Sequence, residues 1–154
     1  AFIVSGVVGM FDTNIAALPL LAVFMPIIAG IGGNTGAQTL AVTVRSIALG
    51  EAGIFDMRRV CVRETCKGFL NGICIGLLGA LLAVITTFRF DLALIVWVAM
   101  VINMSLGGFM GSFIPFTLKR FGFDPASGSS IFTTGFTDSG GFFIFLGLAS
   151  IFLS

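Results

Sequence analysis

One carboxylate, Asp138, lies in a run that otherwise suits a lipid bilayer, IFTTGFTDSGGFFIF at positions 131–145. Ser130, Thr134 and Asp138 recur at four-residue steps, so a helix places them on one face. An aspartate near the centre of a bilayer is costly and generally faces a bundle interior or an aqueous path. The segment therefore predicts a polar stripe that binds a proton or a metal cation. The alternative is a protonated structural aspartate bonded to its own helix.

A second polar run, GIGGNTGAQTLAVTV at positions 30–44, lies in another uncharged segment. Asn34 and Gln38 are four residues apart and share a helix face, and Thr35 lies on the adjoining face. The surrounding glycines weaken the helix and bare backbone carbonyls, which is tolerated at membrane depth only where protein or a water-filled cavity covers them. Hydroxyl, amide and carbonyl oxygens beside Asp138 are hard ligands, which suit Mg²⁺, Ca²⁺ or Mn²⁺ and suit zinc or copper poorly.

The elements that position these groups follow from composition. The 154 residues are 57% hydrophobic and 10% charged, with a mean hydropathy of +1.14, far from the values of soluble domains. Each long stretch between charges reaches the roughly 20 residues that cross a bilayer core. The sequence predicts an all-α membrane protein with a partial helix over about 1–15 and complete helices over about 18–48, 60–87, 92–119 and 126–153.

The first predicted helix is short, because only eleven residues precede Asp12. The segment does not begin with methionine and lacks a signal peptide's basic region and cleavage site, so we expect it to be the end of a longer helix. No linker interrupts the chain, which predicts one domain over 1–154. Three GxxxG pairs predict close helix contacts within a bundle or a dimer, namely Gly32 with Gly36, Gly72 with Gly76, and Gly107 with Gly111.

Charge placement predicts the topology. Basic residues gather in the connection from Arg45 to Lys67 and again at Lys119 and Arg120. By the positive-inside rule both connections are cytoplasmic. Four complete spans then alternate and leave the C-terminus outside, as in a multi-pass protein of a bacterial-type inner or plasma membrane.

The remaining polar groups have simpler explanations. Asp124 precedes Pro125, a pattern typical of a helix N-cap and first helical position, although Asp124 could also gather cations at the cytoplasmic mouth. Asp12 is either a solvated end residue or an entrance carboxylate. The cysteines have no CxxC spacing and no histidine to join them, so we expect small reduced residues at Cys61, Cys66 and Cys74. We expect the arginines of the first connection to pair with solvated carboxylates, namely Glu51, Asp56 and Glu64.

Two segments carry a resemblance, PIIAGIGGNTGAQTLAVTVRSIALGE at 26–51 and FGFDPASGSSIFTTGFTDSGGFFIF at 121–145. They resemble the transmembrane domain of the MgtE family of magnesium channels and transporters, and the resemblance covers nearly the whole chain. It implies a homodimer with five helices per subunit and a pore on the twofold axis, between the second and fifth helices. It also implies cytosolic regulatory domains that close the pore when internal Mg²⁺ is high. Without those domains, we expect this chain not to be gated by internal Mg²⁺.

The resemblance implies a central Mg²⁺ site at Asp138 together with Gly33 and Asn34, and it places Asp124 toward the cytoplasmic side. The family usually has glutamate where Asp12 aligns. With the polar stripe included, the expected metal-binding residues are Asp138, Asn34, Gly33, Thr134 and Ser130. The expected pore-lining or entrance residues are Gln38, Thr35, Asp124 and Asp12.

The sequence thus predicts a Mg²⁺ channel or transporter domain, not an enzyme, that conducts into the cytoplasm down the electrochemical gradient. Mn²⁺, Co²⁺ and Ca²⁺ share the same ligand chemistry. The expected partners are a second copy, the bilayer and the regulatory domains, and no nucleic acid. One alternative is an exchanger that couples Mg²⁺ to Na⁺ or H⁺. An intramembrane aspartyl protease needs a second carboxylate at contact distance, and no other aspartate lies at membrane depth. A non-conducting subunit explains the GxxxG pairs but leaves the polar stripe unexplained.

Overall fold

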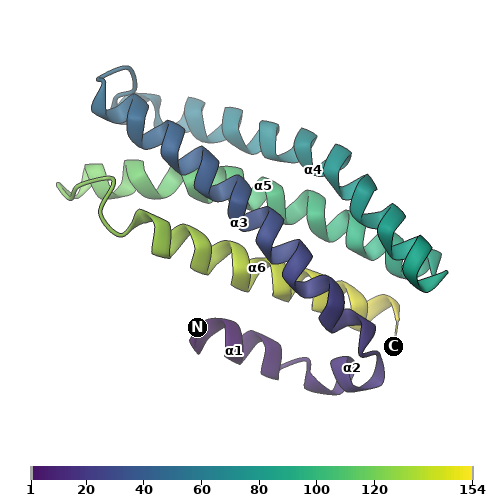
Figure 1. Cartoon of the computed structure of the whole chain (residues 1–154). Helices are drawn as coiled ribbons and strands as arrows, with labels where there is room; N and C mark the ends of the chain where they lie inside the picture. Colours follow the sequence, from purple (N-terminus) through teal and green to yellow (C-terminus); the bar gives the residue numbers. More distant parts are fainter. Residues whose placement is uncertain (1, 154) are drawn as a thin grey trace.

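The computed structural model describes residues 2–153, apart from the side chains of Asn14 and Ala17. Its helices are α1 (Phe2–Gly9), α2 (Asp12–Ala17), α3 (Leu20–Ala48), α4 (Met57–Thr87), α5 (Phe90–Arg120) and α6 (Ser129–Phe152), with a short 3₁₀ helix, η1 (Ile54–Asp56), before α4. No strand occurs in the described part of the chain. The four long helices lie alongside one another in an elongated bundle, and α1 runs beside α6 (Figure 1). The all-α prediction is confirmed.

Four helical segments are long and apolar enough to cross a membrane, namely α3, η1 with α4, α5 and α6. The shortest has 24 residues, which exceeds the roughly 20 that a bilayer core requires. Large apolar side chains of α4, such as Leu78, Leu81 and Ile85, are exposed on the surface of the chain, as expected where lipid is the solvent. The four predicted spans are confirmed, and their boundaries differ from the expected ones by three residues or fewer.

Glycines allow α5 to pack closely against both α3 and α4. Gly72 of α4 lies on the backbone of α5, where an added Cβ would meet the Cα of Val101 at 2.7 Å. Gly107 of α5 lies on α3, where a Cβ would meet the carbonyl oxygen of Gly32 at 2.6 Å. Members of all three GxxxG pairs pack in this way against other helices of the same chain. The pairs therefore build the bundle itself, because small residues let membrane helices approach where hydrophobicity cannot separate helix from lipid.

The first segment differs from the single partial helix expected over 1–15. The chain turns at Met10 and Phe11, where the Phe11 N–H donates to the Val8 carbonyl at 3.0 Å, and a separate helix begins at Asp12. Glycine is a weak helix former, so Gly9 weakens the end of α1, and an aspartate is favourable in the first turn of the helix that follows. The expectation of one continuous helix is therefore wrong, and α1 and α2 are two short helices joined by a turn.

The last helix begins later than expected. Gly128, with a φ of 75°, occupies the N-cap position of α6, and the helix starts at Ser129. Asp124 instead accepts a hydrogen bond from the Ala126 N–H at 3.1 Å, within the turn before the helix. The expectation that Asp124 caps the last helix, with Pro125 in its first turn, is wrong. The chain reverses at Gly128, because glycine adopts a left-handed backbone conformation without a steric penalty.

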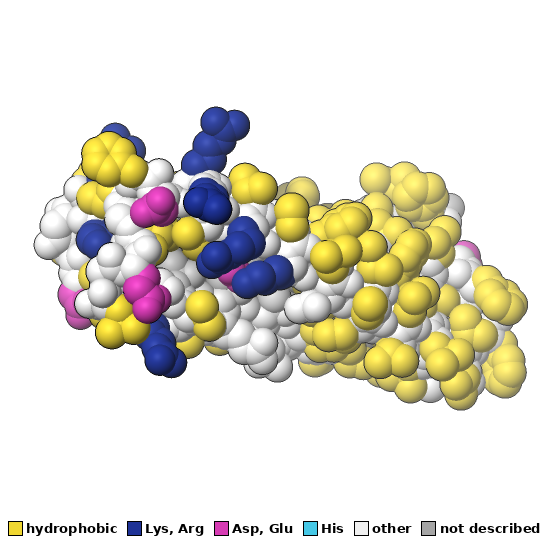
Figure 2. All heavy atoms as spheres, turned by 90° about the horizontal axis from the view of Figure 1, so that it is seen from above, with side chains coloured by type: hydrophobic (Ala, Val, Ile, Leu, Met, Phe, Trp, Pro, Cys, Tyr) yellow, Lys and Arg dark blue, Asp and Glu magenta, His cyan; other side chains and the backbone are white. Residues whose placement is uncertain are grey.

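Charge is concentrated at one end of the bundle. The α3–α4 and α5–α6 connections both lie at the left end in Figure 1, and the basic side chains gather at that end in Figure 2. At the opposite end, Arg89 and Asp91 form an ion pair in which Nη2 and Oδ2 are 2.5 Å apart. The C-terminal end of α6 lies at this second, more apolar end. The end that holds the two connections and the gathered basic side chains is called the basic end below.

Candidate ion-binding site

The two polar segments meet where α3 packs against α6. At Gly33, an added Cβ would lie 3.7 Å from Oδ1 of Asp138 and 3.7 Å from Oγ1 of Thr137. These are ordinary van der Waals distances, so the hydrogen of Gly33 leaves a small open space beside the carboxylate. Two residues that are 105 positions apart in the sequence, Gly33 and Asp138, are thus neighbours in the folded chain.

Asp138 lies inside the membrane-spanning part of α6. It is nine residues past Ser129, which corresponds to about 14 Å along a helix about 36 Å long. The side chain is half-buried, and no ion pair involves it within the described part of the chain. The neighbouring hydroxyl of Thr137 donates to the carbonyl of Thr133 at 3.1 Å and not to the carboxylate. A carboxylate in this position is available to a cation.

The other residues of the predicted stripe lie on the surface of the single chain. Ser130 and Thr134 on α6 are exposed, and so are Asn34 and Gln38 on α3. A polar stripe facing hydrocarbon is unfavourable, since polar groups at membrane depth belong in a bundle interior or along water. The exposure of this stripe therefore indicates a surface that another chain or an aqueous path covers.

Part of the α3 polar segment also faces α4. Thr35 and Gln38 line a cavity of about 190 Å³ together with Glu64, Lys67 and Asn71 of α4. Half of the residues that line this cavity belong to α4, and the cavity lies toward the basic end of the bundle. Both pore-lining residues expected on α3, Thr35 and Gln38, therefore line this cavity, and Gln38 also belongs to the exposed stripe.

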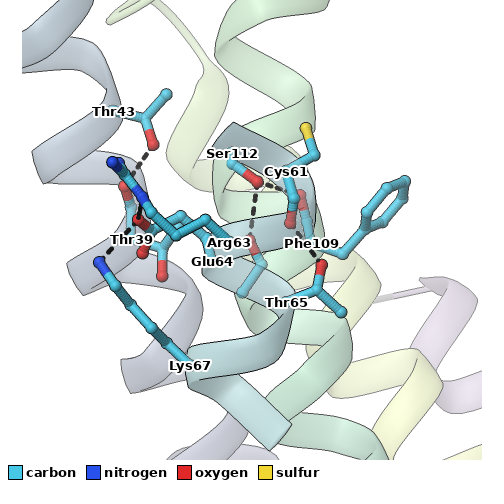
Figure 3. A network of polar contacts seen from close by, with 10 residues as sticks. Thr39, Thr43, Cys61, Arg63, Glu64, Thr65, Lys67, Phe109 and Ser112 are labelled. Carbon is cyan, nitrogen blue, oxygen red and sulfur yellow. Dashed lines mark hydrogen bonds and ion pairs between the residues drawn. The ribbon is translucent and has the colours of Figure 1, made fainter. Parts of the chain in front are cut away.

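Glu64 is the carboxylate whose surroundings differ most from expectation. Its side chain is only 7% exposed, and Oε1 accepts from Arg63 Nε at 3.0 Å and from Lys67 Nζ at 2.8 Å (Figure 3). The prediction of a solvated carboxylate is wrong, although the ion pairing is as expected. Glu64 precedes Gly68 and Gly72 by four and eight residues, so it continues the glycine face that packs on α5. That spacing is the signal in the sequence that predicts its burial.

Asn103 of α5 supports the site from behind and was not identified from the sequence. It is fully buried, and its Nδ2 donates to the carbonyl of Ile28 on α3 at 2.9 Å. Its side chain also fills the space beside Gly32 and Gly141, where an added Cβ would collide with it. Gly32 adjoins Gly33, and Gly141 lies one turn beyond Asp138. Asn103 therefore joins α3, α5 and α6 next to the carboxylate. The feature of the sequence that could have identified it is an amide side chain within an uncharged span.

Asp12 and Asp124 lie away from the central carboxylate. Asp124 is exposed in the α5–α6 connection at the basic end, whereas Asp12 is exposed at the start of α2, near the opposite end (Figure 1). Neither forms an ion pair within the described residues. The three aspartates proposed for the ion path thus lie at different positions along the bundle, with Asp138 between Asp124 and Asp12.

Among residues 2–153, no group of three histidine, cysteine or acidic side chains is close enough to hold a metal ion together. Among these described residues, Asp138 is the carboxylate where α3 packs against α6, and it lies within a candidate membrane span. The surrounding oxygen groups suit a hard cation that keeps part of its water shell. The fold and the site define a multi-span membrane protein with an intramembrane carboxylate, the class to which ion channels and transporters belong.

Comparison with known proteins identifies the family. The MgtE family model, described as a divalent cation transporter, matches residues 25–148, and the chain belongs to this family. The chain is 30% identical over 152 residues to the magnesium transporter MgtE of Thermus thermophilus, covering 98% of this chain and 33% of that protein. It is 28% identical to the magnesium transporters MgtE of Enterococcus faecalis, over 97% of this chain and 33% of the relative, and of Bacillus subtilis, over 98% and 34%. The chain thus spans about a third of the length of these relatives. The family resemblance read from the sequence is confirmed.

Proposed function

We propose that the chain is an ion-conducting membrane domain that carries Mg²⁺ through a pore lined by α3 and α6. The observation that carries this proposal is the pair formed by Asp138 and Gly33, a half-buried carboxylate that has no ion-pair partner among the described residues and lies beside an open space. The three relatives are named as magnesium transporters, which supports Mg²⁺ as the transported ion. Mn²⁺, Co²⁺ and Ca²⁺ are competing ions with related oxygen chemistry.

A second copy of the chain completes this site. One carboxylate balances half the charge of a divalent ion, whereas two Asp138 side chains facing each other across a twofold axis balance all of it. Covering by a second copy also accounts for the exposure of Asn34, Gln38, Ser130 and Thr134, which would otherwise face lipid. The proposed functional unit is therefore a homodimer whose pore lies between the two α3–α6 faces.

The side chains of this face suit a hydrated ion. Mg²⁺ loses its water reluctantly and usually binds through one or two carboxylates while it keeps several waters. Hydroxyl and amide groups at Ser130, Thr134 and Asn34 offer hydrogen bonds to such waters, and Gly33 leaves room for them beside Asp138. The ion is then held through its water shell, weakly enough to be released.

Asp12 and Asp124 are proposed to gather cations at the two ends of this path. The basic end faces the cytoplasm by the positive-inside rule, so the C-terminus lies outside and Asp12 lies toward the outer entrance. An inside-negative potential then drives the divalent ion inward with about 4.6 kcal/mol per 100 mV, twice the value for one charge.

The test is Mg²⁺ flux into proteoliposomes under an imposed inside-negative potential, with native protein compared with Asp138→Asn. The variant keeps the size of the side chain and removes its charge. We expect native flux to persist when no Na⁺ or pH gradient is present, and the variant to lose flux or divalent preference. Asp91→Asn is the control, because it makes the same change at an exposed carboxylate of α5 that lies outside the proposed path.

Both proteins must first elute as the same oligomer. Equal flux through native protein and Asp138→Asn contradicts the proposed site and points to Asn34 and Asp124 as the next residues to change. Native flux that stops when a Na⁺ or H⁺ gradient is collapsed supports the exchanger instead. A native protein that remains monomeric in the membrane contradicts the shared pore.

A further inference from the structure

A large apolar pocket opens at the basic end of the bundle, away from the proposed ion path. It has a volume of about 740 Å³ and lies between the start of α4 and the end of α5. Its apolar walls include Met57, Val62, Phe109 and Phe113. Figure 3 shows the Phe109 ring of α5 projecting beside Cys61 and Thr65 of α4, which also line the pocket. The volume lies within the range of pockets that bind small molecules.

Two arginines from different helices complete this pocket. Arg58 lies in the first turn of α4 and Arg120 is the last residue of α5, and both line the pocket. Both are exposed, and neither forms an ion pair within the described part of the chain. Arginine binds phosphate oxygens through paired, charge-assisted hydrogen bonds. An apolar cavity with two available guanidinium groups therefore matches a ligand with an apolar body and an anionic phosphate.

We propose that this pocket binds one anionic phospholipid, with its acyl chains against Phe109 and Phe113 and its phosphate at Arg58 and Arg120. Lipid is the surrounding solvent at this position, because α4 and α5 both qualify as membrane spans and the arginines lie at their ends. Basic pockets between membrane helices on the cytoplasmic side characteristically bind anionic lipid headgroups. The lipid would tie the start of α4, which carries four of the eight lysines and arginines, to the end of α5.

This lipid site is separate from the proposed ion site. No residue that lines the pocket belongs to the stripe around Asp138 and Gly33. Lipid binding can therefore be present or absent whatever the outcome of the flux measurements.

The first measurement is native mass spectrometry of the full chain released from nanodiscs that contain equal amounts of phosphatidylglycerol and phosphatidylcholine. We expect one phosphatidylglycerol to remain bound per chain. The double variant Arg58→Gln with Arg120→Gln should bind about 100-fold less, since charge-assisted hydrogen bonds from each guanidinium to the phosphate contribute about tenfold. The matched control is Arg45→Gln with Arg59→Gln, which removes the same charge from residues that do not line this pocket.

A second variant tests the apolar part without changing charge. Val62 lines the pocket and its side chain is exposed, so Val62→Trp narrows the cavity and does not disturb the core. We expect it to lower phosphatidylglycerol retention as well. This variant also tests the site if the double arginine variant fails to fold.

The native cysteines report where the lipid binds. Cys66 lines the pocket and is exposed, whereas Cys74, two turns further along α4, is exposed outside it. We expect phosphatidylglycerol, but not phosphatidylcholine, to slow maleimide labelling of Cys66 while leaving Cys74 unchanged. Three outcomes overturn the proposal: equal lipid retention by the two double variants, no preference for phosphatidylglycerol, or protection of Cys66 from maleimide when no phosphatidylglycerol is present. The last outcome would indicate that a second copy of the chain covers the pocket.

Discussion

Replacement of Gly33 by alanine tests the proposed ion site without removing any polar group. The new methyl carbon would lie 3.7 Å from Oδ1 of Asp138 and 3.7 Å from Oγ1 of Thr137, which requires no movement of either side chain. Alanine is also the better helix former, by about 0.5–1 kcal/mol. We therefore expect Gly33→Ala to fold normally and to unfold at the same temperature as native protein or slightly above it.

Gly33→Ala should lower Mg²⁺ transport, although it leaves stability unchanged or slightly higher. A methyl group in this position occupies space where a water of the ion's shell would hydrogen-bond to the carboxylate. Hydrogen bonds to charged groups are worth about 1.5–3 kcal/mol. Loss of one such interaction corresponds to a decrease of about 10- to 100-fold in Mg²⁺ flux.

Mg²⁺ uptake into proteoliposomes under an inside-negative potential measures this effect, and thermal unfolding in detergent measures stability. Gly147→Ala is the matched control, because a Cβ at Gly147 has no neighbour within 4 Å and, nine residues past Asp138, the residue lies on the opposite side of α6 from the carboxylate. Both variants gain the same helix propensity, so a difference between them reports on the space beside Asp138.

Two results would refute this reasoning. Native flux through Gly33→Ala means that hydrated ions do not use the space beside the carboxylate. An equal loss of flux in Gly147→Ala means that helix flexibility, and not the site, limits transport.

Three further changes test the packing around the site by thermal unfolding. Gly32→Ala should destabilise the chain by about 1–3 kcal/mol, because its Cβ collides with Asn103, whereas Gly135→Ala, with no neighbour within 4 Å, should not. Asn103→Ala should destabilise by about 1–3 kcal/mol through the lost hydrogen bond to Ile28, and an unchanged unfolding temperature would contradict its bridging role. Glu64→Gln should change stability by less than about 1 kcal/mol, since the side chains of Arg63 and Lys67 are 57% and 55% exposed, and a larger loss would show that the pair is effectively buried.

The membrane spans could be predicted because they depend on local composition. An uncharged run of about 20 residues crosses a bilayer whatever its neighbours are, and the four long helices follow these runs closely. The periodicity of Ser130, Thr134 and Asp138 likewise defines one helix face without reference to the rest of the chain.

Local turns could not be predicted as reliably. The break at Met10 and the late start of α6 at Ser129 depend on small differences in backbone preference among several short polar and glycine residues. At Asp124 the sequence offered a complete capping pattern, but the chain used the same side chain in a turn. A left-handed Gly128 then provided the start of the helix.

By itself, the sequence determined the all-helical membrane fold, the uneven charge of its two ends and the presence of Asp138 within an otherwise uncharged span. Only the tertiary structure decided that Gly33 lies against Asp138, that Glu64 is buried and that Asn103 joins three helices behind the site. The physical reason is that hydropathy and helical period are properties of neighbouring residues along the chain. Which helix faces meet is decided instead by close backbone packing at glycines of different helices, between residues far apart in the sequence.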